Sequence, residues 1–339
     1  MKKKNLLFPV KYAAFKLTKN KNNKISQKIT KDNFFNKDDI KKNFVLIKVK
    51  YANINFKDYL ISKNSGGMIK KFPHTPGIDA SGIVYYSNSK KFIRNDKVFI
   101  VARPLGIERD GSFSEFVLAP DNWVDKLPNR LSLKEIMMIG TSGFTAIKAL
   151  NKAKKIITKN KNRPVLVSGA TGNVGMFLLL LLKDLKTKIE VISSKNESAN
   201  IFKKLGVNKI HTLKKFLNSP DFALLNEKYS VVFDNLGGEL ISACLKYLIK
   251  GGAVVSIGNI LNNISTINIL PFILREINIL GINAEYSNSS ERKEIFEKFK
   301  IIKSKKLLLN ETKIIKLKDV PKLMKKENYK RKKRILIKI

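Results

Sequence analysis

Three glycines with the spacing G-x-x-G-x-x-G could bind a phosphate group. Gly169, Gly172 and Gly175 lie in the stretch SGATGNVG, between the apolar runs PVLV and MFLLLLL. Glycine has no Cβ, so such a loop can turn tightly and bring backbone N–H groups close to a pyrophosphate, at the positive N-terminal end of the next helix. We therefore expect nucleotide binding here rather than a glycine turn that only packs a helix onto a sheet. The residues expected to contact the nucleotide are Thr171, Gly172, Asn173 and Val174.

The end of the following strand indicates which nucleotide is bound. A chain that binds NAD usually has Asp or Glu about 20 residues beyond the loop, where the carboxylate binds the ribose hydroxyls and repels a 2′-phosphate. Here the strand KIEVISS ends in Ser193 and Ser194, followed by Lys195. Glu190 lies inside the strand and Glu197 beyond its end, so neither takes the place of that acid. Two hydroxyls and a cation suit a phosphate, and we predict NADPH as the cofactor.

The segments around the loop predict an α/β protein of two domains. After Leu131, helical patterns alternate with the apolar runs PVLVSG, KIEVISS, VVFDNLGG and AVVSIGN, which indicates a doubly wound parallel sheet. Residues 8–119 instead contain short β-rich runs separated by glycine and proline, so this half is expected to be mainly β. The polar tract at residues 18–39 is expected to be an extended hairpin or loop. A final helix and strand could return to pack with the first half.

Composition argues against several classes of protein. The net charge is +40, but only nine of the 67 basic residues are arginine, and lysines are spread through nearly every segment. Lysine lacks the bidentate fork of arginine, so a general compositional bias explains this charge better than a nucleic-acid groove does. The longest apolar runs fall far short of the roughly 18 residues of a membrane span. One cysteine and two histidines disfavour a disulfide or a zinc site. We expect a cytoplasmic protein that acts on a small molecule.

Several stretches resemble the medium-chain dehydrogenase/reductase superfamily and, within it, the zinc-free acrylyl-CoA reductase family, whose members are often labelled quinone oxidoreductase-like. The resemblance implies a GroES-like catalytic domain (residues 1–137 and 290–339) and a Rossmann domain (138–289) that binds NADPH. It implies reduction of the C=C bond of acrylyl-CoA to propionyl-CoA, and a homodimer formed through the sheet edge at NILGIN. The stretches that carry it are NINFKD, FPHTPGIDASG, IGTSGFTAIKAL, SGATGNVG, VVFDNLGG and LPFILREINILGIN.

The same resemblance implies the catalytic residues. The family motif Asn-Tyr-Lys-Asp corresponds to Asn55, Phe56, Lys57 and Asp58, of which Asn55, Lys57 and Asp58 are the catalytic candidates and Phe56 would lie near the nicotinamide. Phe56 lacks the hydroxyl of the family's tyrosine, so it cannot act as an acid. No zinc ligand stands where the zinc-dependent branch has one: the matching places hold Asn55, Ile78 and Asp79, so no metal is expected. The remaining expected cofactor contacts are Lys209 and Asn259.

Two other functions are compatible with parts of the sequence. Reduction of quinones or free enones would use the same fold and cofactor, and the sequence separates it poorly from reduction of an acyl-CoA. A non-catalytic nucleic-acid-binding or interaction protein would explain the charge and Phe56, but the chain has no RNA or DNA motif. The short-chain reductases are excluded, because their glycine loop opens the chain and a Tyr-x-x-x-Lys pair follows it, whereas here the loop begins near residue 168.

Overall fold

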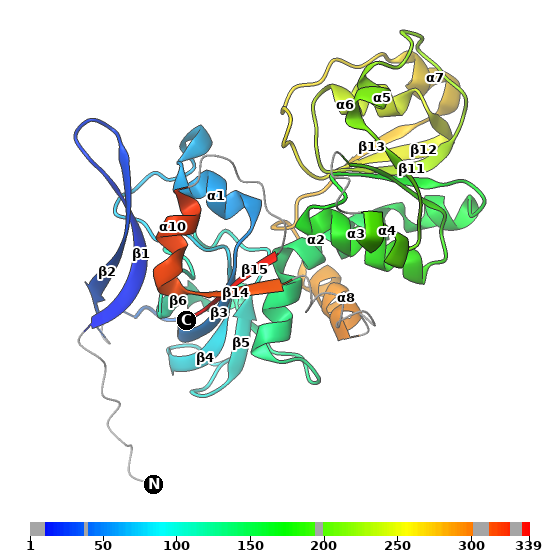
Figure 1. Cartoon of the computed structure of the whole chain (residues 1–339). Coiled ribbons are helices and arrows are strands. Elements are labelled where there is room, and N and C mark those ends of the chain that lie inside the picture. The colour runs from blue at the N-terminus through cyan, green and yellow to red at the C-terminus, as the bar shows by residue number, and fades with distance from the viewer. Residues whose placement is uncertain (1–10, 37–39, 194–198, 301–311, 326–333) are drawn as a thin grey trace. The chain divides into compact units, whose positions relative to one another are not determined.

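The computed structural model describes residues 11–36, 40–193, 199–300, 312–325 and 334–339 (Figure 1). The chain forms two compact units: unit 1 comprises Met1–Thr141 and Phe299–Ile339, and unit 2 comprises Ser142–Lys298. Unit 2 is thus inserted into the sequence of unit 1. The expected domain boundaries, at 137/138 and 289/290, stay a prediction.

Unit 1 is mainly β, as the alternating and β-rich runs of the first half predict. Its principal sheet has the order β14-β15-β3-β4-β5-β7, with β6 also paired to β3, and a separate hairpin joins β1 to β2. Its described elements are β1 (Lys11–Lys19), β2 (Ile25–Asn33), β3 (Phe44–Asn53), α1 (Phe56–Ser62), η1 (Ser65–Gly67), β4 (Asp79–Ser87), β5 (Lys97–Ile100), β6 (Phe116–Pro120), η2 (Asp121–Trp123), β7 (Asp125–Lys126), β14 (Thr312–Lys316), η4 (Leu317–Asp319), α10 (Val320–Met324) and β15 (Arg334–Lys338).

The strand β3 organises this unit. It pairs antiparallel with β4, β6 and β15, so the C-terminal strand does return to the first half of the chain. Side chains from both faces of β3 are buried, which is why FVLIKVKYAN contains a run of consecutive apolar residues rather than a strict alternation. Val45, Ile47 and Val49 pack into one core, whereas Ala52 belongs to a second core that includes Val320 and Met324 of α10.

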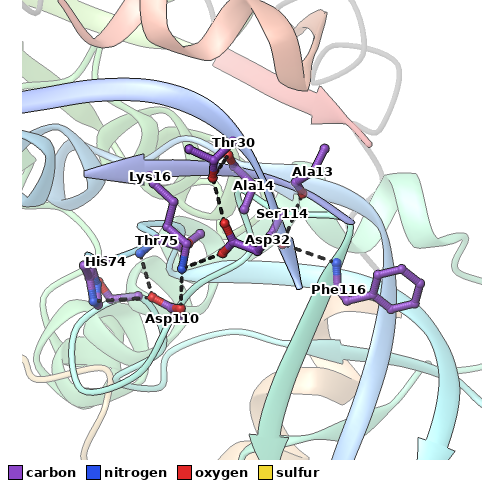
Figure 2. A network of polar contacts seen from close by, with 11 residues as sticks. Ala13, Ala14, Lys16, Thr30, Asp32, His74, Thr75, Asp110, Ser114 and Phe116 are labelled. Carbon is purple, nitrogen blue, oxygen red and sulfur yellow. Dashed lines mark hydrogen bonds and ion pairs between the residues drawn. The ribbon is translucent and has the colours of Figure 1, made fainter. Parts of the chain in front are cut away.

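A buried lysine attaches the hairpin to the rest of unit 1 (Figure 2). The polar tract contains β2, which pairs with β1 along its whole length. This pairing is the hairpin that the sequence predicts. Lys16 Nζ on β1 lies 3.0 Å from Asp32 Oδ2 on β2 and donates to Asp110 Oδ2 at 2.7 Å. Asp110 Oδ1 accepts the backbone N–H of Thr75 at 2.7 Å. Burial opposes the charge on Lys16, but the two carboxylates raise its pKa above the ordinary value. The hairpin is therefore tied to the turn that precedes β4.

Unit 2 is a six-stranded parallel sheet in the order β10-β9-β8-β11-β12-β13. Helices α3 and α4 cover one face, and α5, α6 and α7 cover the other (Figure 1). Among the described residues, none of the helices combines the length and the apolar character needed to cross a membrane. The elements are β8 (Val165–Ser168), α3 (Asn173–Asp184), β9 (Ile189–Ile192), α4 (Ala199–Lys204), β10 (Val207–His211), α5 (Leu213–Leu217), β11 (Tyr229–Asp234), α6 (Glu239–Leu245), β12 (Leu248–Ser256), α7 (Leu270–Arg275), β13 (Asn278–Gly281) and α8 (Ser289–Lys300).

One helix, α2 (Leu133–Lys159), begins in unit 1 and continues into unit 2. Its backbone leaves the helical conformation at Gly140, which has φ +54° and ψ −164°. Such a conformation is open to glycine and costly for residues with a Cβ. The stretch IGTSGFTA is therefore helical, as expected, but contains a break that the sequence pattern did not indicate.

We expect Lys16→Met to lower the free energy of unfolding of unit 1 by about 1–3 kcal/mol, because it leaves Asp32 and Asp110 without their shared cation. Lys28 is the cross-strand neighbour of Lys16 and is exposed, so Lys28→Met is a matched control that should change stability little. Urea unfolding of the two variants measures both effects. Equal stability of the two variants would contradict a structural role for the buried lysine.

Candidate functional site

The glycine loop of unit 2 joins β8 to α3 as the sequence predicts. Gly169 has φ +57°, and Gly172 is the extended N-cap residue of α3, which begins at Asn173. A Cβ on Gly175 would come within 2.6 Å of the Gly169 carbonyl oxygen, so the third glycine lets the helix approach the loop closely. Gly172 is exposed, and Thr171, Asn173 and Val174 are half-buried. The loop can therefore present backbone N–H groups at the start of a twelve-residue helix.

A buried polar group of β11 supports this loop. Ser168, the residue before Gly169, donates its hydroxyl to Asp234 Oδ1 at 2.6 Å and accepts the backbone N–H of Asn235 at 2.9 Å. The Asn235 amide donates to the Ser168 carbonyl at 2.8 Å. Asp234 also accepts the backbone N–H groups of Leu236 and Gly237. Burial raises the pKa of Asp234, and these donors oppose the rise. The motif VVFDNLGG thus holds the end of β8 in place, a role that sequence reasoning missed.

The end of β9 carries the residues expected to distinguish NADPH from NADH. Ser193 is half-buried, and its backbone N–H donates to the His211 carbonyl at 3.0 Å. Ser194 and Lys195 lie outside the described residues. Lys209 on β10 and Asn259 after β12 are both exposed.

Glu190, the acid nearest to this point inside the strand, is fully engaged elsewhere. Its Oε2 accepts from His211 Nε2 at 2.6 Å, from Lys228 Nζ at 2.6 Å and from the Tyr229 hydroxyl at 2.9 Å. Burial opposes the charge on Glu190, but these donors lower its pKa below the ordinary value. Glu190 is 8% exposed, so its carboxylate is part of the packing of the sheet. His211 is likewise buried and packs beside Glu190.

In unit 1 the motif NINFKD forms the start of α1. Asn55 is the N-cap residue, and its backbone N–H donates to Asp58 Oδ2 at 2.7 Å in a capping box. The other oxygen of Asp58 accepts the backbone N–H of Ile78 at 2.9 Å, and Asp58 is completely buried. Phe56 and Lys57 in the first turn are only half-buried. Of the four motif residues, these two are therefore the more accessible to a ligand.

Asp79 is the polar centre of this region. Its Oδ2 accepts the Asn55 amide at 2.8 Å and the backbone N–H of Thr141 at 3.0 Å, and its Oδ1 accepts the Thr141 hydroxyl at 2.5 Å. The Asn53 amide lies 3.4 Å from Oδ2. Burial raises the pKa of Asp79, and these donors oppose the rise. Three stretches that carry the family resemblance, NINFKD, FPHTPGIDASG and IGTSGFTAIKAL, thus meet at one carboxylate.

Arg334, from the C-terminal strand, adds a positive charge near Asp79. It is 6% exposed and donates to the carbonyl of Met138 in α2. Burial lowers the pKa of Arg334 to about 9, and the charge of Asp79 opposes this effect. The guanidinium therefore stays protonated at neutral pH. Lys333, the residue before it, lies outside the described residues.

His74, the other histidine, packs inside unit 1. His74 is buried, and its Nε2 bonds the Gly106 carbonyl at 2.8 Å, so it packs the turn before β4. Within the part of the chain that the structure describes, no three His, Cys, Asp or Glu side chains gather into a group that could hold a metal ion.

Comparison with known proteins identifies the family. Residues 41–129 match the model described as alcohol dehydrogenase GroES-like domain, and residues 173–300 match the one described as zinc-binding dehydrogenase. The chain is 33% identical to YhfP of Bacillus subtilis, over 77% of this chain and 79% of that protein. The name of YhfP describes it as a quinone oxidoreductase. It is 28% identical to the acrylyl-CoA reductase AcuI of Ruegeria pomeroyi, over 75% of this chain and 77% of that one.

Two crystal structures resemble this chain over nearly its whole length. The structure of YhfP with NAD bound has a TM-score of 0.88 and 29% identity, and covers 98% of this chain and 100% of its own. The yhdH oxidoreductase of Salmonella enterica in complex with NADP also has a TM-score of 0.88, at 25% identity, and covers 96% of this chain and 99% of its own. Together with the matches of both units, they show that the chain belongs to the medium-chain dehydrogenase/reductase family of oxidoreductases.

Proposed function

We propose that the protein reduces the C=C bond of acrylyl-CoA to propionyl-CoA with NADPH as the hydride donor. The observation that carries the proposal is the glycine loop that opens α3, since its backbone is shaped and supported for a pyrophosphate. The acrylyl-CoA reductase AcuI is among the relatives. Several relatives carry the name quinone oxidoreductase instead, so a quinone is the alternative substrate.

NADPH is favoured over NADH by the chemistry at the end of β9. The hydroxyl of Ser193 follows the strand, and Ser194 and Lys195 come next in the sequence. Glu190 Oε2 accepts three hydrogen bonds inside the sheet and the residue is buried, which makes it a poor partner for ribose hydroxyls. The sequence there thus offers hydroxyl and ammonium donors to a 2′-phosphate. Of the two related structures, one holds NAD and the other NADP, so the preference for NADPH is inferred from the residues at the end of β9.

The reaction itself requires orientation and charge stabilisation from the protein. When bound, NADPH supplies the hydride for the β-carbon of the substrate. The thioester oxygen then gains negative charge, which a donor in the site must stabilise, and the α-carbon takes up a proton. Lys57 is a half-buried cation in the first turn of α1, and we assign it to the oxyanion. Phe56 has no proton to give and would provide only an apolar surface for the ring of the cofactor.

Asn55 and Asp58 have a different part in this proposal. Their polar atoms are engaged in the capping box and with Ile78 and Asp79. We therefore assign them to positioning Phe56 and Lys57 rather than to contact with the reacting atoms. Phe56 cannot donate a proton, so we assign protonation of the α-carbon to solvent water.

The homodimer expected at the NILGIN edge has support in the exposed surface of unit 2. Ile264 is 70% exposed and Ile273 is 65% exposed, and Ile279 lies on β13, the last strand in the sheet order. Arg275 donates to the carbonyls of Leu225, Lys246 and Leu248 and so fixes α7 with Ile273 outward. Exposed apolar side chains beside a sheet edge fit a second copy of this chain.

The substrate is tested by the loss of NADPH absorbance with acrylyl-CoA, crotonyl-CoA and a quinone, each at the same concentration. We expect oxidation of NADPH with acrylyl-CoA at a kcat/KM well above that for the other two. Activity confined to the quinone would support the alternative, quinone or enone reduction by the same fold and cofactor. The absence of NADPH oxidation with all three substrates would refute both functions.

Lys57→Ala should lower kcat by about a hundredfold, the size of effect seen when one oxyanion donor is lost. Its thermal unfolding should change little, because Lys57 is half-buried and lies in the first turn of the helix. Lys63→Ala, at the C-terminal end of the same helix, is the control and should keep wild-type turnover. A wild-type kcat in Lys57→Ala would contradict the assignment of Lys57 to the oxyanion.

Light scattering tests the dimer. The wild type should have twice the mass of the 38.5-kDa chain, and Ile273→Glu should shift it to the monomer. Ile93 in unit 1 is 70% exposed, so Ile93→Glu is a control of equal chemistry that should leave the dimer intact. A monomeric wild type would overturn this part of the proposal without affecting the reaction.

A further inference from the structure

We infer that Asp79 is a positioning residue of the proposed reductase: through Asn55 and Thr141 its carboxylate fixes the first turn of α1, which carries Phe56 and Lys57. The inference rests on the proposed function only for the consequence in turnover. Asp79 has no exposed surface, so it acts through its neighbours and not by touching substrate.

A closed ring of hydrogen bonds joins α1 to the turn before β4. The Asn55 amide donates to Asp79 Oδ2 at 2.8 Å, and the backbone N–H of Asn55 donates to Asp58 Oδ2 at 2.7 Å. Asp58 Oδ1 accepts the N–H of Ile78, the residue bonded to Asp79, and so completes the ring. Because the ring holds Asn55 through both its amide and its backbone, the direction in which α1 starts is fixed relative to the Ile78–Asp79 backbone.

The second contact of Asp79 runs through Thr141. The Thr141 hydroxyl donates to Asp79 Oδ1 at 2.5 Å and accepts the backbone N–H of Ala102 at 2.7 Å. Ala102 has φ +50°, a left-handed conformation that residues other than glycine adopt at a cost. The hydroxyl therefore stabilises a strained loop on one side and the buried carboxylate on the other.

The packing around Asp79 leaves no room for an alternative. A Cβ on Gly140 would lie 2.7 Å from Asp79 Oδ2 and 2.8 Å from the Asn53 amide nitrogen, so only glycine fits at the break in α2. The Ser112 hydroxyl donates to the backbone carbonyl of Asp79 at 2.5 Å. Arg334 lies near enough for the charge of Asp79 to act on its pKa, and it donates to the carbonyl of Met138. The carboxylate thus accepts hydrogen bonds from Asn53 and Asn55 and from Thr141, which is distant from them in sequence.

A matched pair of substitutions at Thr141 separates positioning from simple stability. Thr141→Val removes the hydroxyl and keeps the shape, whereas Thr141→Ser keeps the hydroxyl. Asp79→Asn removes the charge, and Asp121→Asn is its control, since Asp121 is another buried carboxylate of unit 1, bonded to Ser89 and Lys91. Each variant is measured in three ways: kcat with saturating NADPH and substrate, the NADPH dissociation constant by fluorescence, and hydrogen exchange of backbone amides in residues 54–62.

We expect Thr141→Val and Asp79→Asn to lower kcat by about tenfold to a hundredfold, the loss caused by a small misplacement of reacting groups. Exchange in residues 54–62 should become about tenfold faster, as expected when a buried acceptor loses a donor. The NADPH dissociation constant should change less than kcat does, because Phe56 is the one expected cofactor contact on α1 and the glycine loop belongs to unit 2. Thr141→Ser and Asp121→Asn should behave as the wild type in all three measurements.

The exchange rates decide the inference independently of the reaction. Unchanged exchange in residues 54–62 of both Thr141→Val and Asp79→Asn would overturn it, whatever their activity. Faster exchange with wild-type kcat would also overturn it, because Asp79 would then be structural only. If the wild type itself shows no turnover, the proposed function fails, while faster exchange in these variants would still establish the fixing of α1 by Asp79.

Discussion

A carboxylate without contact with water needs a full set of hydrogen-bond donors, and this constraint organises unit 1. Asp79 obtains its donors from Asn53 and Asn55 near the start of α1 and from Thr141 in α2. An unpaired buried charge costs far more than any single hydrogen bond gains, so each of these segments must reach its place for the others to be stable. The glycine at position 140 and the strained backbone at Ala102 follow from the same requirement.

Unit 2 meets a similar constraint in a different way. Asp234 accepts the hydroxyl of Ser168 and two backbone N–H groups, and so holds the residue just before the glycine loop. The loop closes on itself through the backbone N–H of Gly172, which donates to the Gly169 carbonyl at 2.9 Å, and α3 begins at the next residue. In both units, therefore, buried acids shape the backbone on which accessible residues depend.

Local sequence patterns predicted the glycine loop and the strands, but not the contacts between residues that are distant in sequence. The glycine spacing predicted the loop that precedes α3, and the apolar runs predicted strands of the parallel sheet, because both depend on neighbours in sequence. The capping box at Asn55 and Asp58 could also have been read from its spacing. The contact of Asp79 with Thr141 joins residues 62 positions apart, and Glu190 meets Lys228 across 38 positions. Such pairings depend on strand order, which periodicity does not contain.

The claim that most needs a direct test is that the glycine loop and the end of β9 form a site for NADPH. Equilibrium titration of the protein with NADPH and, separately, with NADH, followed by cofactor fluorescence, measures it without any assumption about substrate. The account predicts saturable binding of NADPH that is tighter than that of NADH by about tenfold or more, the difference that one well-placed charged hydrogen bond provides. Equal or tighter binding of NADH would contradict the assignment of Ser193 and its neighbours, and no binding of either would contradict the site itself.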